Sequence, residues 1–148
     1  MSASVLVIDD DPLVSQFVDL VLTQAGYQVS LASSPETGFK ALQRTRWDLV
    51  LLDVQMPGMS GIQLLKMLRQ YQRLKVPVMM MTAKGDLDTV RSASHAGANG
   101  YLVKPFTPDG LLARVEAVLD KRERPSPAKP MVSVARNAVA ESAVYVID

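Results

Sequence analysis

The sequence has no cysteine and only one histidine among its 148 residues. Without cysteine the chain forms no disulfide bond and no thiolate metal site, a composition that fits a reducing cytoplasm. The single histidine, His95, falls in a weakly apolar segment, and we expect a surface residue there. No apolar run approaches the roughly 20 residues that a membrane-spanning helix needs. The sequence therefore predicts a soluble, cytoplasmic protein.

An excess of charge of either sign is also lacking, since 16 basic and 15 acidic residues leave a formal net charge of +1. The balance favours neither a nucleic-acid nor a membrane partner. Residues 1–4 carry no basic stretch, and the apolar run that follows stops at three aspartates, so we expect no secretory signal. Hydrophobic residues make up 48% of the chain, enough to pack the core of one ordinary domain.

Five short apolar runs recur along the first 103 residues. They are Val5–Ile8, Tyr27–Ala32, Leu49–Leu52, Val78–Met81 and Tyr101–Val103. Most are continuous rather than alternating, which is typical of strands covered on both faces, as in a parallel sheet.

The segments between these runs have helical spacing and begin with residues that cap helices. Asp11, followed by Pro12, is the expected N-cap of the first, and the others begin at Ser33-Ser34-Pro35-Glu36, Ser60, Asp86 and Thr107-Pro108-Asp109. In the first segment Leu13, Phe17, Leu20 and Val21 follow helical spacing, and Gly26 is placed to end the helix. The fourth, residues 86–96, has few large apolar residues and should pack lightly. Strand and helix thus alternate five times, which predicts an α/β, doubly wound parallel sheet with helices on both faces.

The pattern ends near Arg122, so we expect one domain over residues 1–123. Residues 124–148 begin with a proline-rich linker and end in a short tail. The last six residues, Ala143 to Asp148, echo Ser4 to Asp9. Two interpretations stay open: a tail that orders only against a neighbour or not at all, or the start of a second, similar domain.

Polar residues stand where the predicted strands end. Asp9 and Asp10 follow the first run, Asp53 the third, Thr82 the fourth and Lys104 the fifth. The carboxyl ends of parallel strands share one edge of the sheet, where ligands bind, so we expect these side chains to meet.

Three clustered carboxylates repel one another unless a cation neutralises them. An oxygen-only ligand set favours Mg²⁺ over zinc. A carboxylate can also attack phosphorus to form an aspartyl phosphate, and Lys104 with the metal would neutralise charge on the phosphoryl oxygens. The predicted chemistry is phosphoryl transfer.

Four stretches resemble the receiver domains of bacterial two-component response regulators. They are Asp9-Asp10, the segment Asp53 to Gly61, Met81-Thr82-Ala83, and Gly97-Ala98 followed by Tyr101 to Phe106. The resemblance covers about residues 4 to 122. It implies a flavodoxin-like fold with five parallel strands in the order 2-1-3-4-5.

The resemblance also implies the role of each acidic residue. Asp53 is the expected phosphoacceptor. Asp10, Asp53 and the backbone carbonyl of Gln55 are expected to bind Mg²⁺ directly, with Asp9 contributing mainly through water.

The resemblance also implies roles in phosphate binding and in the conformational switch for Lys104, Thr82 and Tyr101. Lys104 should hold the phosphoryl group and precede a cis Pro105. Thr82 should donate its hydroxyl to a phosphoryl oxygen, while Tyr101 swings inward to fill the space that Thr82 leaves. The implied function is phosphorelay signalling, in which the domain switches conformation and catalyses only its own phosphorylation and dephosphorylation.

The implied partners are a sensor histidine kinase or a histidine phosphotransfer protein, with a small acyl phosphate as an alternative donor. The effector is unknown, and we expect no direct contact with nucleic acid or membrane. A homodimer stays open, although Ala98-Asn99-Gly100 lacks the acidic residues that some subfamilies use in dimer salt bridges.

Two long side chains, Gln55 and Lys84, flank the expected site, and we expect them to shield an acyl phosphate from water. Three rival functions are disfavoured. A phosphatase would need a second acid where Gln55 stands, and a nucleotide or flavin carrier would need a phosphate-binding loop where Asp10-Asp11-Pro12 stands. A degenerate receiver would lack some of the polar residues.

Overall fold

The computed structural model describes residues 2–83, 85–123 and 144–146, and contains the predicted parallel sheet. Five parallel strands lie in the order β2-β1-β3-β4-β5. Their bounds are β1 Ser4–Ile8, β2 Gln28–Ala32, β3 Leu49–Asp53, β4 Val78–Thr82 and β5 Gly100–Val103. The helices between and after them are α1 Pro12–Gln24, α2 Pro35–Arg44, α3 Gly61–Gln70, α4 Leu87–Ala96 and α5 Pro108–Glu123.

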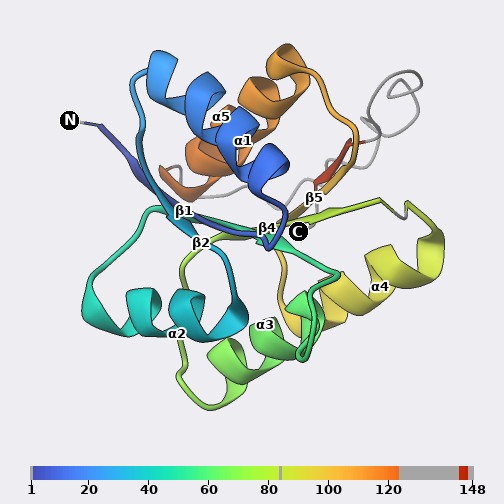
Figure 1. The fold of residues 1–148 in the computed structure, drawn as a ribbon. Helices are drawn as coiled ribbons and strands as arrows, with labels where there is room; N and C mark the ends of the chain where they lie inside the picture. The colour runs from blue at the N-terminus through green and yellow to red at the C-terminus, as the bar shows by residue number, and fades with distance from the viewer. Residues whose placement is uncertain (1, 84, 124–143, 147–148) are drawn as a thin grey trace.

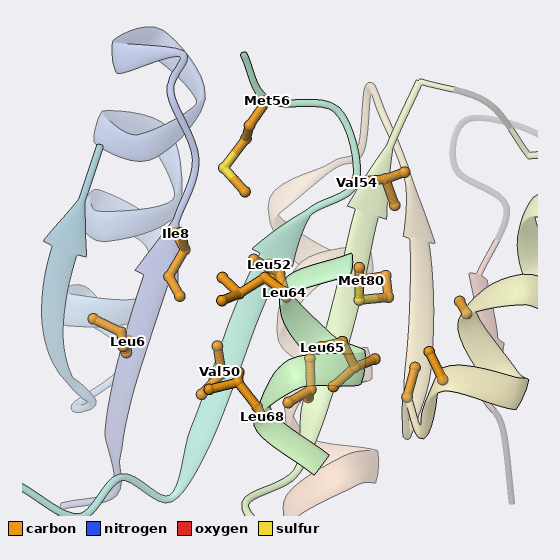
Figure 2. Packing of buried hydrophobic residues seen from close by; sticks show 14 of the residues in the cluster. Leu6, Ile8, Val50, Leu52, Val54, Met56, Leu64, Leu65, Leu68 and Met80 are labelled. Atoms are coloured by element: carbon orange, nitrogen blue, oxygen red, sulfur yellow. The ribbon is translucent and has the colours of Figure 1, made fainter. Parts of the chain in front are cut away.

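Helices cover both faces of the sheet, as the alternation of the sequence predicts (Figure 1). Helices α1 and α5 lie on one face, and α2, α3 and α4 on the other. Each face has its own hydrophobic cluster, because neighbouring residues of a strand point to opposite sides. Leu6, Val50 and Leu52 pack on the α3 side (Figure 2), whereas Val5, Leu49 and Leu51 pack under α1 and α5.

The helix starts that the sequence predicts are confirmed by capping bonds. Asp11 accepts a hydrogen bond from the backbone N–H of Leu13, and Asp86 from that of Thr89. Ser34 and Ser60 each form a reciprocal capping box with the residue three positions later. Gly26, with a φ of 100°, follows the end of α1, as expected.

The interior face of α1 differs from the stripe expected from the sequence. Phe17 and Val21 of that stripe pack against the core as partly buried residues, but Leu13 is 75% exposed and Leu20 58% exposed, so neither leucine belongs to the core. The buried residues are Ser15, Val18 and Leu22, one turn or two apart on the neighbouring face. The helix is apolar on more than one side, so spacing alone does not fix which side meets the sheet. Helix α4 packs lightly as expected, burying only Ala93 and Ala96.

The sheet has one strand that the sequence did not predict. Strand β6, Val144–Val146, pairs antiparallel with β5, with Gly100 opposite Val146 and Leu102 opposite Val144. The expected proline-rich linker lies outside the described residues, so the domain boundary stays a prediction. Among the described residues, no helix combines the length and apolar character that crossing a bilayer requires.

Candidate functional site

The carboxyl ends of β1 and β3 bring three acidic side chains together, as predicted. Asp9, Asp10 and Asp53 each offer a carboxylate oxygen, and these three oxygens lie within 4.8 Å of one another. Asp9 and Asp53 are buried, whereas Asp10 is exposed. An all-carboxylate cluster of this size, with one member open to solvent, fits a hard divalent cation.

Lys104 joins this cluster from the end of β5. Its Nζ donates to Asp9 Oδ2 at 2.9 Å and to Asp53 Oδ1 at 3.3 Å. The sequence predicts Lys104 and Asp9 at the same edge, but not this direct ion pair. The sequence did hint at this ion pair, because it places three carboxylates and Lys104 at the same edge, so more than one carboxylate can bond to the Lys104 ammonium.

Burial and crowding perturb the acid–base properties of the cluster. Burial, followed by the neighbouring charge of Asp9, raises the pKa of Asp53 to about 6, although Lys104 acts in the opposite direction. Burial alone would lower the pKa of Lys104, but its bond to Asp9 and the charges of both aspartates raise it above the usual value. Lys104 is therefore a fixed positive charge beside a carboxylate that holds its proton unusually well.

The loop after β3 holds Asp53 in place through backbone contacts. Val54 donates to the carbonyl of Met81 at 2.8 Å, and Gly61 donates to the carbonyl of Val54 at 2.8 Å. A Cβ atom on Gly61 would collide with the backbone carbonyl of Asp53, so only glycine fits there. The exposed Gln55 follows in this loop, and its N–H donates to Asp53 Oδ1 at 3.4 Å.

Thr82 and Tyr101 are both fully buried, Thr82 at the end of β4 and Tyr101 within β5. Tyr101 pairs in register with Met80, and Thr82 with Val103. Thr82 and Tyr101 therefore share one face of the sheet, two residues apart along the strand direction. The backbone N–H of Lys104 donates to the carbonyl of Thr82 at 2.7 Å. The expected cis peptide bond between Lys104 and Pro105 is confirmed.

This arrangement brings together a buried carboxylate, a cluster of carboxylates that could hold a cation, and an ammonium at one edge of the sheet. The chemistry that needs these three together is attack of a carboxylate on a phosphoryl group. The three aspartates at this edge would repel the free phosphate that a nucleotide carrier binds.

Curated relatives of this chain include a DNA-binding response regulator and a transcriptional regulatory protein. The chain is 38% identical over 123 residues to the DNA-binding response regulator MtrA of Mycolicibacterium smegmatis, covering 83% of this chain and 53% of that protein. It is 36% identical over 131 residues to the alkaline phosphatase synthesis transcriptional regulatory protein PhoP of Bacillus subtilis, covering 88% and 54%. The chain thus spans about half the length of the curated relatives it matches.

Solved structures of similar proteins superpose on this chain over nearly their own whole length. The chemotaxis protein CheY4 of Vibrio cholerae superposes with a TM-score of 0.76 at 34% identity, covering 80% of this chain and 99% of that one. A putative response regulator from Chloroflexus aurantiacus gives 0.76 at 37% identity, covering 81% and 99%. A sequence model described as the response regulator receiver domain matches residues 5–116. The chain therefore belongs to the response regulator receiver domain family, whose members are regulatory domains of phosphorelay signalling rather than enzymes that turn over a substrate.

Proposed function

We propose that this chain accepts a phosphoryl group on Asp53 with the help of Mg²⁺ and passes the signal on by a change of conformation. The observation that carries the proposal is the meeting of the Asp9, Asp10 and Asp53 carboxylates within 4.8 Å, with Lys104 bonded to two of them. Asp10 and Asp53, with the carbonyl of Gln55, would hold the metal, and Asp9 would act through water.

The chain's own residues then have distinct tasks. Asp53 supplies the attacking carboxylate oxygen. As its bond to phosphorus forms, the donor's bond from phosphorus to histidine nitrogen, or to the acetate oxygen of acetyl phosphate, breaks, and the histidine or acetate leaves. Bound Mg²⁺ would neutralise charge on the carboxylates and on the phosphoryl oxygens. Lys104 moves its bond from Asp53 to a phosphoryl oxygen while keeping its bond to Asp9, which holds the ammonium in position throughout. The outcome is one aspartyl phosphate with its charge shared between the metal and Lys104.

The proposed switch uses Thr82 and Tyr101. Thr82 would donate its hydroxyl to a phosphoryl oxygen, and Tyr101 would take the space that this movement leaves. The burial of both side chains on one face of the sheet supports this coupling, because a shift of either one changes the space around the other. We therefore assign signal output to the surface over α4 and β5.

The partners follow from family membership and stay part of the proposal. A sensor histidine kinase or a histidine phosphotransfer protein would supply the phosphoryl group in the cytoplasm, with acetyl phosphate as a substitute donor. The curated relatives include DNA-binding regulators, so an effector outside residues 1–123 is the expected route to transcription. A homodimer would be a second output, formed without acidic residues at Ala98-Asn99-Gly100.

The test is the intact mass of the protein after incubation with acetyl phosphate, with Mg²⁺ or with EDTA. We expect one phosphoryl adduct that requires Mg²⁺ and is absent from Asp53→Asn. Asp120→Asn, which removes an exposed carboxylate on α5, is the matched control and should be phosphorylated normally. An adduct on Asp53→Asn, or one formed equally well in EDTA, would refute the proposal.

The role of the exposed Gln55 can be tested by measuring how fast the phosphoryl adduct decays. Gln55 follows Asp53 by two residues and its long side chain would shield the acyl phosphate from water. Its expected companion, Lys84, lies outside the described residues. We expect the adduct to decay faster in Gln55→Ala than in the native protein, with decay followed by intact mass. Equal or slower decay would show that Gln55 does not protect the phosphoryl group.

A further inference from the structure

A cavity of about 580 Å³ lies at the edge of the sheet opposite Asp53. Two loops border it: residues 45–48, which lead from α2 into β3, and residues 74–76, which lead from α3 into β4. Both helices lie on the same face of the sheet (Figure 1). Strand β3 therefore runs from this cavity at its start to Asp53 at its end. The volume is within the range of small-molecule sites.

The walls of the cavity are fixed by hydrogen bonds between side chains and backbone. The indole Nε1 of Trp47 donates to the carbonyl of Ala41 at 3.0 Å, which holds the ring against the end of α2. On the other side, Arg69 Nη1 donates to the carbonyl of Leu74 at 2.8 Å. Because these bonds tie both loops to their helices, the cavity is formed before any ligand arrives.

The lining is positively charged. Arg44, Arg46 and Lys75 line the cavity, against a single carboxylate, that of Asp48. Asp48 Oδ2 accepts from the backbone N–H of Ser4 at 2.8 Å and from its hydroxyl at 3.2 Å, so that carboxylate is directed toward β1. Among the residues that the structure describes, no ion pair joins Arg44, Arg46 or Lys75 to a carboxylate.

The aromatic residue of the cavity faces a second hollow as well. A space of about 370 Å³ beside α2 and β2 shares Arg44, Thr45 and Trp47 with the first and adds Lys40. Trp47 thus lines both hollows, and each hollow is also lined by basic side chains. A guanidinium group can donate two parallel hydrogen bonds to a phosphate group. The flat face of an indole ring can stack against the planar ring of a ligand.

We propose that this cavity binds a nucleotide, with its phosphates on Arg44, Arg46 and Lys75 and its base against Trp47. The site goes beyond the phosphorylation of Asp53 and does not depend on it. The acidic edge repels a free phosphate, whereas the opposite edge offers three cations that have no carboxylate partner among the described residues. A nucleotide here would contact the two loops that precede β3 and β4, the strands that end in Asp53 and Thr82.

Trp47 is the only tryptophan of the chain, so its fluorescence reports on this cavity alone. The experiment titrates the full chain in EDTA with ATP, and in parallel with tripolyphosphate, adenosine and sodium chloride at matched ionic strength. We expect ATP to change the fluorescence with saturation. The double variant Arg44→Gln/Lys75→Gln should bind ATP at least about tenfold more weakly, since two charge-assisted contacts are lost. Both residues are exposed, so the variant should fold normally, which circular dichroism checks.

Two controls separate this site from its surroundings. Arg91→Gln removes an exposed cation from α4 and should leave ATP binding unchanged, as should Asp53→Asn. Unchanged affinity in the double variant, or an equal response to sodium chloride, would overturn the proposal. Tripolyphosphate binding as tightly as ATP would overturn the assignment of a base to Trp47, and isothermal titration calorimetry would decide this without relying on the fluorescence.

Discussion

Asp53 is the residue in which structure and chemistry are most closely linked. Burial near Asp9 raises its pKa to about 6, so the ionised carboxylate that the reaction needs is held at a cost in stability when no metal is bound. A bound cation would lower that cost, so the proposed metal binding and the strain at Asp53 would have the same cause, the crowding of carboxylates. When no metal is bound, the positive charge of Lys104 offsets part of this cost.

This strain predicts a gain in stability for Asp53→Asn in metal-free buffer. The folded protein holds the proton of Asp53 more tightly than the unfolded chain, where the pKa is near 3.8. Stability is therefore lost as the pH rises from about 4 through about 6. Near neutral pH the variant should be more stable by about 1–3 kcal/mol, and the difference should vanish below about pH 4.

The measurement is urea unfolding in EDTA at a series of pH values, with Asp120→Asn as the control for loss of an exposed charge. A native protein that equals or exceeds Asp53→Asn in stability at neutral pH would show that Asp53 is not strained.

Gly61 leads to a second prediction at the scale of a residue. A methyl group at this position would collide with the carbonyl of Asp53, so Gly61→Ala must push the phosphoacceptor strand end or the start of α3 aside. We expect a loss of about 1–3 kcal/mol in unfolding free energy and a slower reaction with acetyl phosphate. Gln70→Ala, an exposed change on the same helix, should alter neither. Wild-type stability in Gly61→Ala would mean that the contact relaxes freely.

At the scale of elements, the parallel sheet is complete without β6. The five parallel strands and their helices end at Glu123, while β6 adds only residues 144–146 to the outer edge of β5. An unpaired strand edge offers backbone donors and acceptors to other chains. Removing β6 should therefore expose an edge without emptying the core.

We predict that a chain of residues 1–123 folds cooperatively with nearly the melting temperature of the full chain and self-associates more strongly. Differential scanning calorimetry and sedimentation velocity measure the two quantities. Loss of cooperative unfolding would contradict the domain boundary, and unchanged association would show that β6 does not protect the edge.

The elements also show how far the sequence predicts the fold. Continuous apolar runs such as Leu49–Leu52 and capping residues such as Ser60 predict the strands and helix starts, because each is a local requirement. The side of α1 that meets the sheet and the pairing of β6 are set by distant partners, and neither was predicted. The edge that collects Asp53 and Lys104 follows from strand direction, whereas the bond from Lys104 to Asp9 depends on side-chain positions that spacing does not give.

On the scale of the whole molecule, charge is divided between the two ends of the sheet. The carboxyl edge carries Asp9, Asp10 and Asp53, whereas the cavity at the amino edge carries Arg44, Arg46 and Lys75. The net charge of +1 conceals this division. We accordingly propose a cation and the transferred phosphoryl group at the first edge, and a nucleotide at the second.

The most direct test of the central claim is to locate the phosphoryl group on the chain. After reaction with acetyl phosphate and Mg²⁺, borohydride reduces an aspartyl phosphate to homoserine, and peptide mass spectrometry identifies the reduced position. The account predicts homoserine at Asp53 alone. Homoserine at Asp9 or Asp10 instead, or phosphate retained on another residue such as His95 with Asp53 unmodified, would contradict it.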